Sequence, residues 1–462
     1  MGAAGNLLVI DATVVTPSDD LPARSLPLTF FDVKWLRPPP VQRLFLYRLD
    51  RQHHHGTAQQ LVSDLRRSLS MVLTLFYPLA GHVRLTPGTD RYELFYQPGD
   101  GVAFTAAEYD VHVDDLASCS DDEPVPVAKL APLLPPLPKG RAVLAVQATV
   151  LLGGSGLALG ITLHHSACDG ASSTHFLHTW AAACAGVDMP PPPVIDRTLI
   201  ADPKNLYGIY TKGMVPSDGA EIEFAGTSLA SYPADQLLAT FTLSQELLRG
   251  IKDALAAEAA RHGAATMPFK CSSLIAAYSF IWSCYCRAKQ SQNLVDDGDR
   301  TKTTYFLFSV DHRTRLDPPV PKWYLGNCLG PAIAAARHDE LAADALGGLF
   351  AAFTAIADAL EEAVGEGARD RWDGCVERVK EAVKAGVLSV AGSPRFGVYD
   401  VDFGFGRPAK VDIVSVAKTG AMSMAEGRGS LGGVEVGISL PPAGMDRFRR
   451  CFSDGIRAVG GK

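Results

Sequence analysis

A polar, proline-dotted segment separates two long apolar regions, and it constrains the fold more than any other feature of the sequence. Its prolines stand at positions 190–193, 203, 216 and 233. Such a composition suits a surface linker rather than a helix or strand. A chain of 462 residues is also too long for one ordinary hydrophobic core. The sequence therefore predicts two domains, at residues 1–195 and 236–462, joined by a crossover linker at 196–235.

Both halves contain patterns of helices and of strands. In the first half, residues 59–79 carry apolar side chains at helical spacing, and residues 142–152 and 157–164 flank a glycine-rich turn like a hairpin. In the second half, Ser244 precedes a helical pattern at 245–261. The second half also has helical patterns at 272–288 and 341–364 and a buried strand pattern at 305–310. These alternating elements predict a mixed α/β fold in each domain.

Charge and cysteine content exclude several classes of protein. The net charge of -7 is opposite in sign to the basic excess of a nucleic-acid-binding surface. The nine cysteines lack the paired spacing of zinc sites, so no metal is expected, and their odd number suits a reducing compartment. The first residues lack a signal-peptide pattern, and no apolar run reaches the roughly 20 residues of a membrane helix. A soluble cytosolic protein is predicted.

The strongest chemical signal is the run Leu163–Gly170, which reads LHHSACDG. An apolar strand there delivers two histidines, and small residues, Asp169 and a helical pattern at 171–185 follow. A histidine can accept a proton from an alcohol that attacks a carbonyl. The alternative is that both histidines are core residues and Asp169 only caps the helix. Because strand side chains alternate, His164 and His165 point to opposite faces, and the pattern does not say which one faces a cleft.

Two glycine-punctuated segments are weaker signals. Residues 399–408 interleave glycines with aromatic residues, and residues 324–330 read YLGNCLG. Each is consistent with a structural turn or with a backbone that passes close to a ligand. Gly-x-Ser-x-Gly, phosphate-loop and dinucleotide motifs are all missing from the sequence, which disfavours a hydrolase of the α/β class and a nucleotide-dependent enzyme.

Together these segments resemble the plant BAHD acyltransferases, which use acyl-CoA thioesters. That family carries a His-x-x-x-Asp motif in mid-chain and an Asp-Phe-Gly-Trp-Gly motif near the end. The corresponding segments here are His165–Asp169 and Asp402–Gly406, and further matches occur at residues 26–32, 77–81 and 310–313. The resemblance selects His165 rather than His164 as the base.

One branch of the family is similar in two further segments. The run Tyr324–Cys328 resembles its Tyr-Phe-Gly-Asn-Cys motif, and Leu26–Asp32 is similar to its Leu-Thr-Phe-Phe-Asp segment. That branch acylates sugars on anthocyanins, flavonoids and other phenolic glycosides, often with malonyl groups. The chain departs from the family at Phe405, where the motif usually has tryptophan. If the indole N–H polarised the thioester carbonyl, the oxyanion here would need another donor.

The resemblance implies a CoA-dependent acyltransferase-like fold, with two similar-sized α/β domains and the active site in a channel at their interface. His165 would be the general base, Asp169 would hold its loop, and Asp402 is a further catalytic candidate. No acyl-enzyme is required, so Cys168 is not a nucleophile in this interpretation. No cofactor would be bound permanently, since acyl-CoA is a co-substrate.

Binding of CoA needs hydrogen bonds and positive charge for its phosphates. Ser272 and Ser273 begin a helix at the position where the family binds a CoA phosphate, and a helix N-terminus suits an anion. Lys252, Lys270 and Arg313 are the candidate cations. The motifs add a last group of candidates for substrate or CoA binding: Asn327, Gly404 and Phe405.

The leading hypothesis is malonyl transfer from malonyl-CoA to a sugar hydroxyl of an anthocyanin, flavonoid or phenolic glucoside. The alternative within the same chemistry is hydroxycinnamoyl transfer to a similar acceptor. A third interpretation is a small-molecule binder that kept the fold without activity. A malonyl donor needs a cation for its free carboxylate and an aromatic donor needs an apolar slot, and the sequence identifies neither. One active site per chain makes a monomer sufficient.

Overall fold

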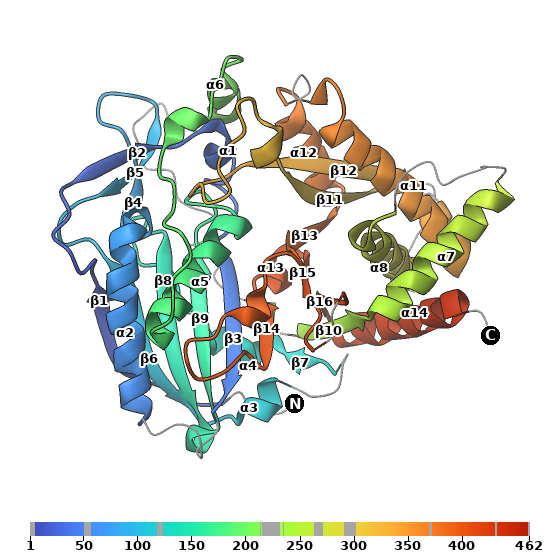
Figure 1. Cartoon of the computed structure of the whole chain (residues 1–462). Helices are drawn as coiled ribbons and strands as arrows, with labels where there is room; N and C mark the ends of the chain where they lie inside the picture. The colour runs from blue at the N-terminus through green and yellow to red at the C-terminus, as the bar shows by residue number, and fades with distance from the viewer. Residues whose placement is uncertain are drawn as a thin grey trace.

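A computed structural model describes residues 5–49, 57–117, 123–212, 214, 232–233, 235–262, 271–290, 302–368, 372–429 and 432–460. Within them the chain forms two large sheets and one small one, with helices packed on the sheets (Figure 1). This mixed α/β architecture confirms the predicted fold class. No helix in the described residues has the length and apolar character needed to cross a bilayer.

The first large sheet has six strands and belongs mainly to the first half of the chain. Its order is β1 (Leu7–Val15), β6 (Val102–Tyr109), β8 (Leu144–Leu151), β9 (Gly156–Leu163), β3 (Val41–Arg48) and β14 (Lys410–Ile413). β6 and β8 are parallel, and the remaining neighbours are antiparallel. The expected hairpin is confirmed as β8 and β9. A small sheet of β2 (Arg24–Pro27), β5 (Tyr92–Tyr96) and β4 (His82–Leu85) lies beside it.

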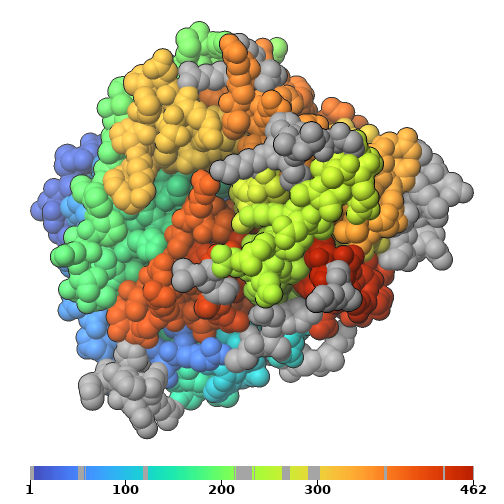
Figure 2. All heavy atoms as spheres, turned by 45° about the vertical axis from the view of Figure 1, so that its right-hand side comes forward, coloured from blue at the N-terminus to red at the C-terminus, as the bar shows by residue number. Residues whose placement is uncertain are grey.

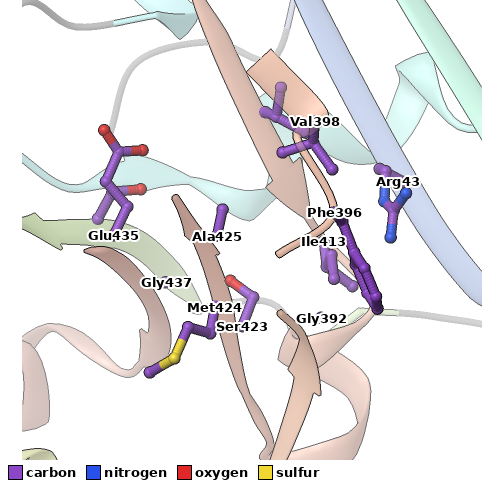
Figure 3. Close-up of a pocket in the computed structure, with 12 residues that line it drawn as sticks. Arg43, Gly392, Phe396, Val398, Ile413, Ser423, Met424, Ala425, Glu435 and Gly437 are labelled. Carbon is purple, nitrogen blue, oxygen red and sulfur yellow. The ribbon is translucent and has the colours of Figure 1, made fainter. Parts of the chain in front are cut away.

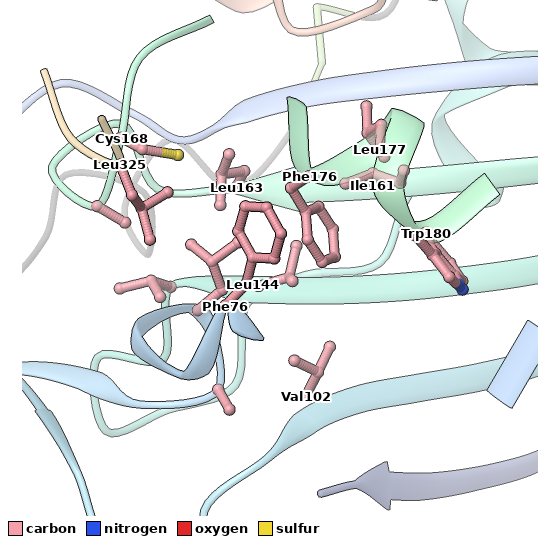
Figure 4. Packing of buried hydrophobic residues seen from close by; sticks show 14 of the residues in the cluster. Phe76, Val102, Leu144, Ile161, Leu163, Cys168, Phe176, Leu177, Trp180 and Leu325 are labelled. Carbon is pink, nitrogen blue, oxygen red and sulfur yellow. The ribbon is translucent and has the colours of Figure 1, made fainter. Parts of the chain in front are cut away.

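Two helices cover one face of this sheet, α2 (Ala58–Leu75) and α5 (Gly170–Ala185). They pack together, and the Trp180 indole N–H on α5 donates to the Leu65 carbonyl on α2, with 3.1 Å between the two atoms. Beneath the helices lies a buried cluster that includes Phe176 and Leu163 (Figure 4). This core fixes the end of β9, from which the chain turns into α5.

The second large sheet has seven strands. Its order is β12 (Leu329–Arg337), β11 (Thr303–Asp311), β13 (Leu388–Gly392), β15 (Met422–Glu426), β16 (Val434–Leu440), β10 (Leu237–Leu243) and β7 (Val125–Pro126). Four long helices pack against it and enclose a second core: α7 (Gln245–Arg261), α8 (Ser273–Gln290), α11 (Ala345–Val364) and α14 (Pro442–Gly460). The predicted helices and the strand of this half are confirmed, and the Ser244 hydroxyl accepts from the Leu247 N–H at the start of α7.

Two strands cross the expected domain boundary. β14 comes from the second half, but it pairs with β3 in the first sheet, with Ile413 opposite Arg43. β7 comes from the first half and pairs with β10 in the second sheet. In Figure 2 the orange surface of residues near position 400 lies directly against the green surface of the first half. The sheets therefore interlock at the interface of the two halves.

Candidate active site

His165 stands just beyond the end of β9, where the chain turns toward α5. Its Nδ1 atom lies 3.0 Å from the side-chain oxygen of Asn327, which precedes β12 in the second half of the chain. The Trp35 ring stacks on the imidazole at a centroid distance of 3.8 Å and an interplanar angle of 16°. The two halves of the chain therefore meet at this histidine, and its ring is held on one face and at one nitrogen.

Asn327 has a fixed amide orientation, which in turn sets the tautomer of His165. Its Nδ2 atom donates to Asp32 Oδ1 and to the His165 carbonyl, each at 2.9 Å. The amide oxygen therefore faces the imidazole and accepts from it, so Nδ1 of His165 carries the proton. The other nitrogen, Nε2, is left as the basic atom of the ring. This is the arrangement that a general base requires.

Asp32 anchors this chain of hydrogen bonds. It is fully buried on the short helix α1 (Phe30–Val33), where it accepts from the N–H and hydroxyl of Thr29 at 2.8 and 2.7 Å. It also accepts from the Asn327 N–H at 3.0 Å. Sequence reasoning missed Asp32 and Trp35 as site residues. The only signal for Asp32 was its place in the Leu26–Asp32 segment that matches the family branch.

His164 is engaged with a different partner from that of His165. It is 1% exposed, and its Nδ1 atom lies 2.6 Å from the Ser166 hydroxyl. Burial lowers the pKa of His164 to about 3, so this histidine stays neutral. Burial also lowers the pKa of His165, while Asp169 and the Asn327 hydrogen bond act in the opposite direction. His165 is thus neutral near pH 7 and able to accept a proton.

Asp169 holds the loop after His165 through a buried ion pair. Its two oxygens accept from Arg313 Nη1 and Nη2 at 2.8 and 3.0 Å, and they also accept from the N–H groups of Ser172 and Cys328. The Arg313 guanidinium holds the pKa of Asp169 below its usual range, against the effect of burial. Arg313, expected as a candidate cation for CoA, is 4% exposed and engaged in this pair.

Cys168 does not have the character of a nucleophile. Its side chain is 2% exposed, and burial raises its pKa well above that of an ordinary thiol. A thiol must ionise to attack a carbonyl, so this group stays unreactive near neutral pH. The observation agrees with an acyl transfer that passes through no acyl-enzyme.

The Asp402–Gly406 motif lies at the opposite end of α5 from His165. Gly404 packs against Ala185, the last residue of this 16-residue helix, which is about 24 Å long. Asp402 Oδ1 accepts from the N–H groups of Gly404 and Gly406, so it shapes its own loop. Phe405 is buried against Tyr47 at a ring distance of 4.9 Å. The structure does not bring Asp402, Gly404 or Phe405 together with His165.

Three of the expected CoA residues, Ser272, Ser273 and Lys252, lie together at the start of α8. The Ser272 hydroxyl accepts from the Ile275 N–H at 3.2 Å, which caps the helix, and Lys252 Nζ donates to the Ser273 hydroxyl at 2.9 Å. A lysine beside a capped helix N-terminus is a suitable environment for a phosphate. Lys270 lies outside the described residues. The role of these residues in CoA binding stays a prediction.

Comparison with known proteins identifies the family. The model of the Transferase family matches residues 6–454. The chain is 32% identical to phenolic glucoside malonyltransferase 1 of Arabidopsis thaliana, with 96% of each chain covered. It is 30% identical to the coumaroyl-CoA:anthocyanidin 3-O-glucoside-6''-O-coumaroyltransferase 1 of the same plant, with 96% of this chain and 95% of the relative covered.

Two solved structures share the fold. Vinorine synthase superposes with a TM-score of 0.69 at 20% identity, with 96% of each chain covered. TRI101 of F. graminearum, solved with coenzyme A and T-2 mycotoxin, superposes with a TM-score of 0.63 at 17% identity, with 92% of this chain and 97% of TRI101 covered. The predicted two-domain acyltransferase fold is thereby confirmed. Since the family model and the relatives span nearly the whole chain, this protein belongs to the Transferase family, as an acyltransferase of the BAHD type.

Proposed function

We propose that this enzyme transfers a malonyl group from malonyl-CoA to a sugar hydroxyl of an anthocyanin, flavonoid or phenolic glucoside. The observation that carries the proposal is the hydrogen-bonded chain from Asp32 through Asn327 to His165, which leaves Nε2 of His165 as a base. A relative named as a phenolic glucoside malonyltransferase supports the donor and the acceptor class. The CoA complex of TRI101 supports CoA as the carrier.

The proposed reaction proceeds in two proton-coupled steps. Nε2 of His165 takes the proton of the acceptor hydroxyl while that oxygen attacks the thioester carbonyl carbon. The tetrahedral intermediate then collapses, the carbon–sulfur bond breaks, and Nε2 returns the proton to the CoA sulfur. Asn327 stabilises the transient imidazolium, because its amide oxygen accepts from Nδ1. Asp169 and Arg313 act by fixing the loop.

A second candidate is hydroxycinnamoyl transfer by the same residues. The relative named as a coumaroyltransferase supports it, since that protein is almost as similar to this chain as the malonyltransferase is. The two donors differ in the acyl group alone, so the mechanism above serves both.

The test is a turnover assay with two donors and two proteins. Wild type and His165→Ala each receive malonyl-CoA or p-coumaroyl-CoA with a panel of flavonoid and phenolic glucosides, and thiol release and product mass are measured. We expect malonylated product from wild type, and a loss of about a hundredfold or more in His165→Ala. Coumaroylated product alone would contradict malonyl-CoA as the donor. Full activity of His165→Ala would contradict His165 as the base. A protein that only binds would release no thiol.

We also propose that the enzyme works in the cytosol as a monomer. All cysteines in the described part of the chain are free, which suits a reducing compartment. A single chain supplies Asp32, Asn327 and His165. Light scattering of the purified protein at assay concentration tests the oligomeric state, and a dimer that loses activity on dissociation would contradict it.

A further inference from the structure

A cavity lies between the two large sheets, at the interface of the two halves. It is a small pocket whose roughly 370 Å³ of space is partly open to solvent, and it lies between β3 and β14 of the first sheet and β13, β15 and β16 of the second. Its wall is mixed: Phe396, Val398 and Ile413 are apolar lining residues, and Ser423 and Glu435 are polar ones (Figure 3). One cation, Arg43 on β3, projects into this wall.

Arg43 is a buried cation with few partners. The residue is 6% exposed, and its guanidinium makes one long hydrogen bond, 3.4 Å from Nη1 to the Thr174 hydroxyl on α5. Its Nε atom has no hydrogen-bond partner, and no carboxylate of the described residues forms an ion pair with it. A guanidinium buried without a counterion is strongly unfavourable. That cost also lowers the pKa of Arg43 to about 10.

Neither acidic group near the cavity forms an ion pair with Arg43. Glu426 attracts it electrostatically from beyond ion-pair distance; its Oε1 accepts from the Tyr399 N–H, and its Oε2 is buried without a hydrogen-bond partner in the described part of the chain. Glu435 lines the cavity, but its oxygens accept from the Tyr399 hydroxyl at 2.5 Å and from the Arg428 N–H at 2.9 Å. Burial raises the pKa of Glu435, so its anionic form is disfavoured. An external anion would therefore complete the surroundings of Arg43.

Arg43 pairs with strand β9, from whose end the chain continues to His165. Arg43 pairs with Ile161 across β3 and β9, and paired residues share a face. Ile161 lies two residues before the end of β9, and His165 follows in the turn that leads into α5. Both residues border α5: Arg43 contacts Thr174, and His165 precedes the helix.

The cavity wall also touches the loop that follows His165. Gly170, the first residue of α5, packs so closely on the Phe396 ring that an added Cβ would lie 2.6 Å from it. The Phe396 carbonyl is 3.1 Å from His178 Nε2, further along the same helix. Phe396 thus links the cavity to the segment that carries the base.

We propose that Arg43 binds the free carboxylate at the end of the acyl chain, so that the cavity selects monothioesters of short dicarboxylic acids. The inference rests on the proposed acyl transfer and adds the residue that recognises the donor. A guanidinium can bind a carboxylate through two parallel hydrogen bonds. The apolar part of the wall suits the methylene carbons of the chain. A CoA phosphate is the other possible anion, but its bulky nucleotide fits poorly in so small a space.

The test compares Arg43→Met with a matched control, Arg48→Met. Arg48 lies on the same strand, half-exposed, in an ion pair with Asp114. With one acceptor, kcat/KM is measured for malonyl-CoA and acetyl-CoA. We expect Arg43→Met to lose about ten- to hundredfold with malonyl-CoA and to keep its activity with acetyl-CoA, and Arg48→Met to change neither. An equal loss with both donors, or an unchanged preference for malonyl-CoA, would overturn the inference.

Two further variants sharpen the result. Lys34 is a second cation close enough to His165 to affect its pKa, and it donates to the Leu329 carbonyl. Loss of the malonyl preference in Lys34→Met but not in Arg43→Met would assign the carboxylate to Lys34 and overturn the inference. Arg43→Gln repeats the test with a polar side chain if the methionine variant folds poorly. Inhibition by free CoA should be the same in Arg43→Met as in wild type, whereas weaker inhibition would indicate a phosphate at Arg43.

The failure of this inference is distinguishable from failure of the proposed function. If wild type releases no thiol from any acyl-CoA, the proposed function fails, and calorimetry of malonyl-CoA and acetyl-CoA binding then tests Arg43 alone. Tighter binding of malonyl-CoA that disappears in Arg43→Met would support the inference. If wild type uses coumaroyl-CoA and not malonyl-CoA, acyl transfer stands and the role of Arg43 is overturned.

Discussion

The side-chain oxygen of Asn327 lies 3.0 Å from Nδ1 of His165, across 162 positions of sequence. Because the amide nitrogen of Asn327 is engaged by Asp32 and by the His165 carbonyl, this oxygen has one orientation. The second half of the chain therefore determines which nitrogen of a first-half histidine is basic. The basic nitrogen of His165 therefore depends on contact between the two halves of the chain.

Removal of the Asn327 amide should weaken the base without removing it. In Asn327→Ala the imidazolium loses its hydrogen-bond acceptor, so we expect kcat to fall about ten- to hundredfold with little change in KM. The Asn327 hydrogen bond favours the protonated imidazole, so its loss should lower the pKa of His165 further. The kcat/KM profile against pH would show this as an acidic limb at lower pH. A lower kcat with an unshifted limb would indicate a purely structural role.

The pH dependence of wild type should reflect the burial of His165. Protonated His165 is no base, so activity is lost as the pH falls through the pKa of the folded enzyme. Burial lowers that pKa from the usual 6.5, so the acidic midpoint of kcat/KM should lie below pH 6.5. The measurement is the kcat/KM profile over pH 4–8 under conditions that keep the protein folded. A midpoint at or above 6.5 would contradict the prediction.

Asp169 should act mainly on stability. In Asp169→Ala the buried Arg313 loses its buried partner and, among the described carboxylates, keeps only the half-exposed Asp311, which should lower the free energy of unfolding by about 3–5 kcal/mol. Urea unfolding at pH 7 measures this. The control is Asp339→Ala, which removes an exposed partner of Arg337 and should change little. A small loss in Asp169→Ala, equal to that of the control, would contradict the buried ion pair.

The stabilisation from Asp169 should also depend on pH. Arg313 depresses the pKa of Asp169 in the folded state, so the contribution is complete above the carboxyl pKa of the unfolded chain. It is lost as the pH falls below that value and through the folded pKa. The difference in stability between wild type and Asp169→Ala should therefore shrink in acid. If this difference in stability stays constant down to the lowest pH at which both proteins are folded, ionisation of Asp169 is not its source.

Phe405 should prove to be a packing residue. Its ring packs on Tyr47 and on Phe403, so Phe405→Ala should cost about 3–5 kcal/mol of stability. Phe405→Trp, which restores the usual family residue, should leave kcat of the folded enzyme unchanged because the motif lies at the far end of α5 from His165. Thermal unfolding and kcat per folded molecule check the two effects separately. A large gain in kcat in Phe405→Trp would instead implicate the indole N–H.

Lys252 should contribute to the affinity for CoA. It lies beside the N-terminus of α8, where positive charge and N–H groups suit a phosphate. We expect Lys252→Met to raise KM for acyl-CoA about three- to tenfold, with kcat and the KM for the acceptor unchanged. Lys289→Met, at the other end of the same helix, is the control. An equal KM for acyl-CoA in both variants would indicate that the CoA phosphates bind elsewhere.

Local signals predicted much of the fold. The helix after Ser244 begins and ends as its leucine spacing indicates, and the hairpin of β8 and β9 follows its glycine-rich turn. Strands β7 and β14 could not be predicted in the same way, because they have two and four residues and are defined by partners far along the chain. No local pattern marks such a pairing.

The candidate site was predictable in its motif and not in its geometry. His165 and Asp169 stand out because they are close together between a strand and a helix. The contact of Asp32 with Asn327 spans 295 positions, and the family resemblance indicated the two segments without their pairing. No sequence pattern marked Arg43 as a site residue, because a cation in a strand is usually exposed. The burial of Arg43 is visible only when both sheets are present.

The exchange of β7 and β14 limits how this protein can be divided or recombined. A protease that cuts the linker would leave two fragments still hydrogen-bonded through both sheets, so they should elute together from a sizing column. A chimera that joins one half to a relative's other half also imports a foreign edge strand into each sheet. To keep both sheets native, such a chimera must exchange residues 125–126 and 410–413 together with the sheet that each segment completes.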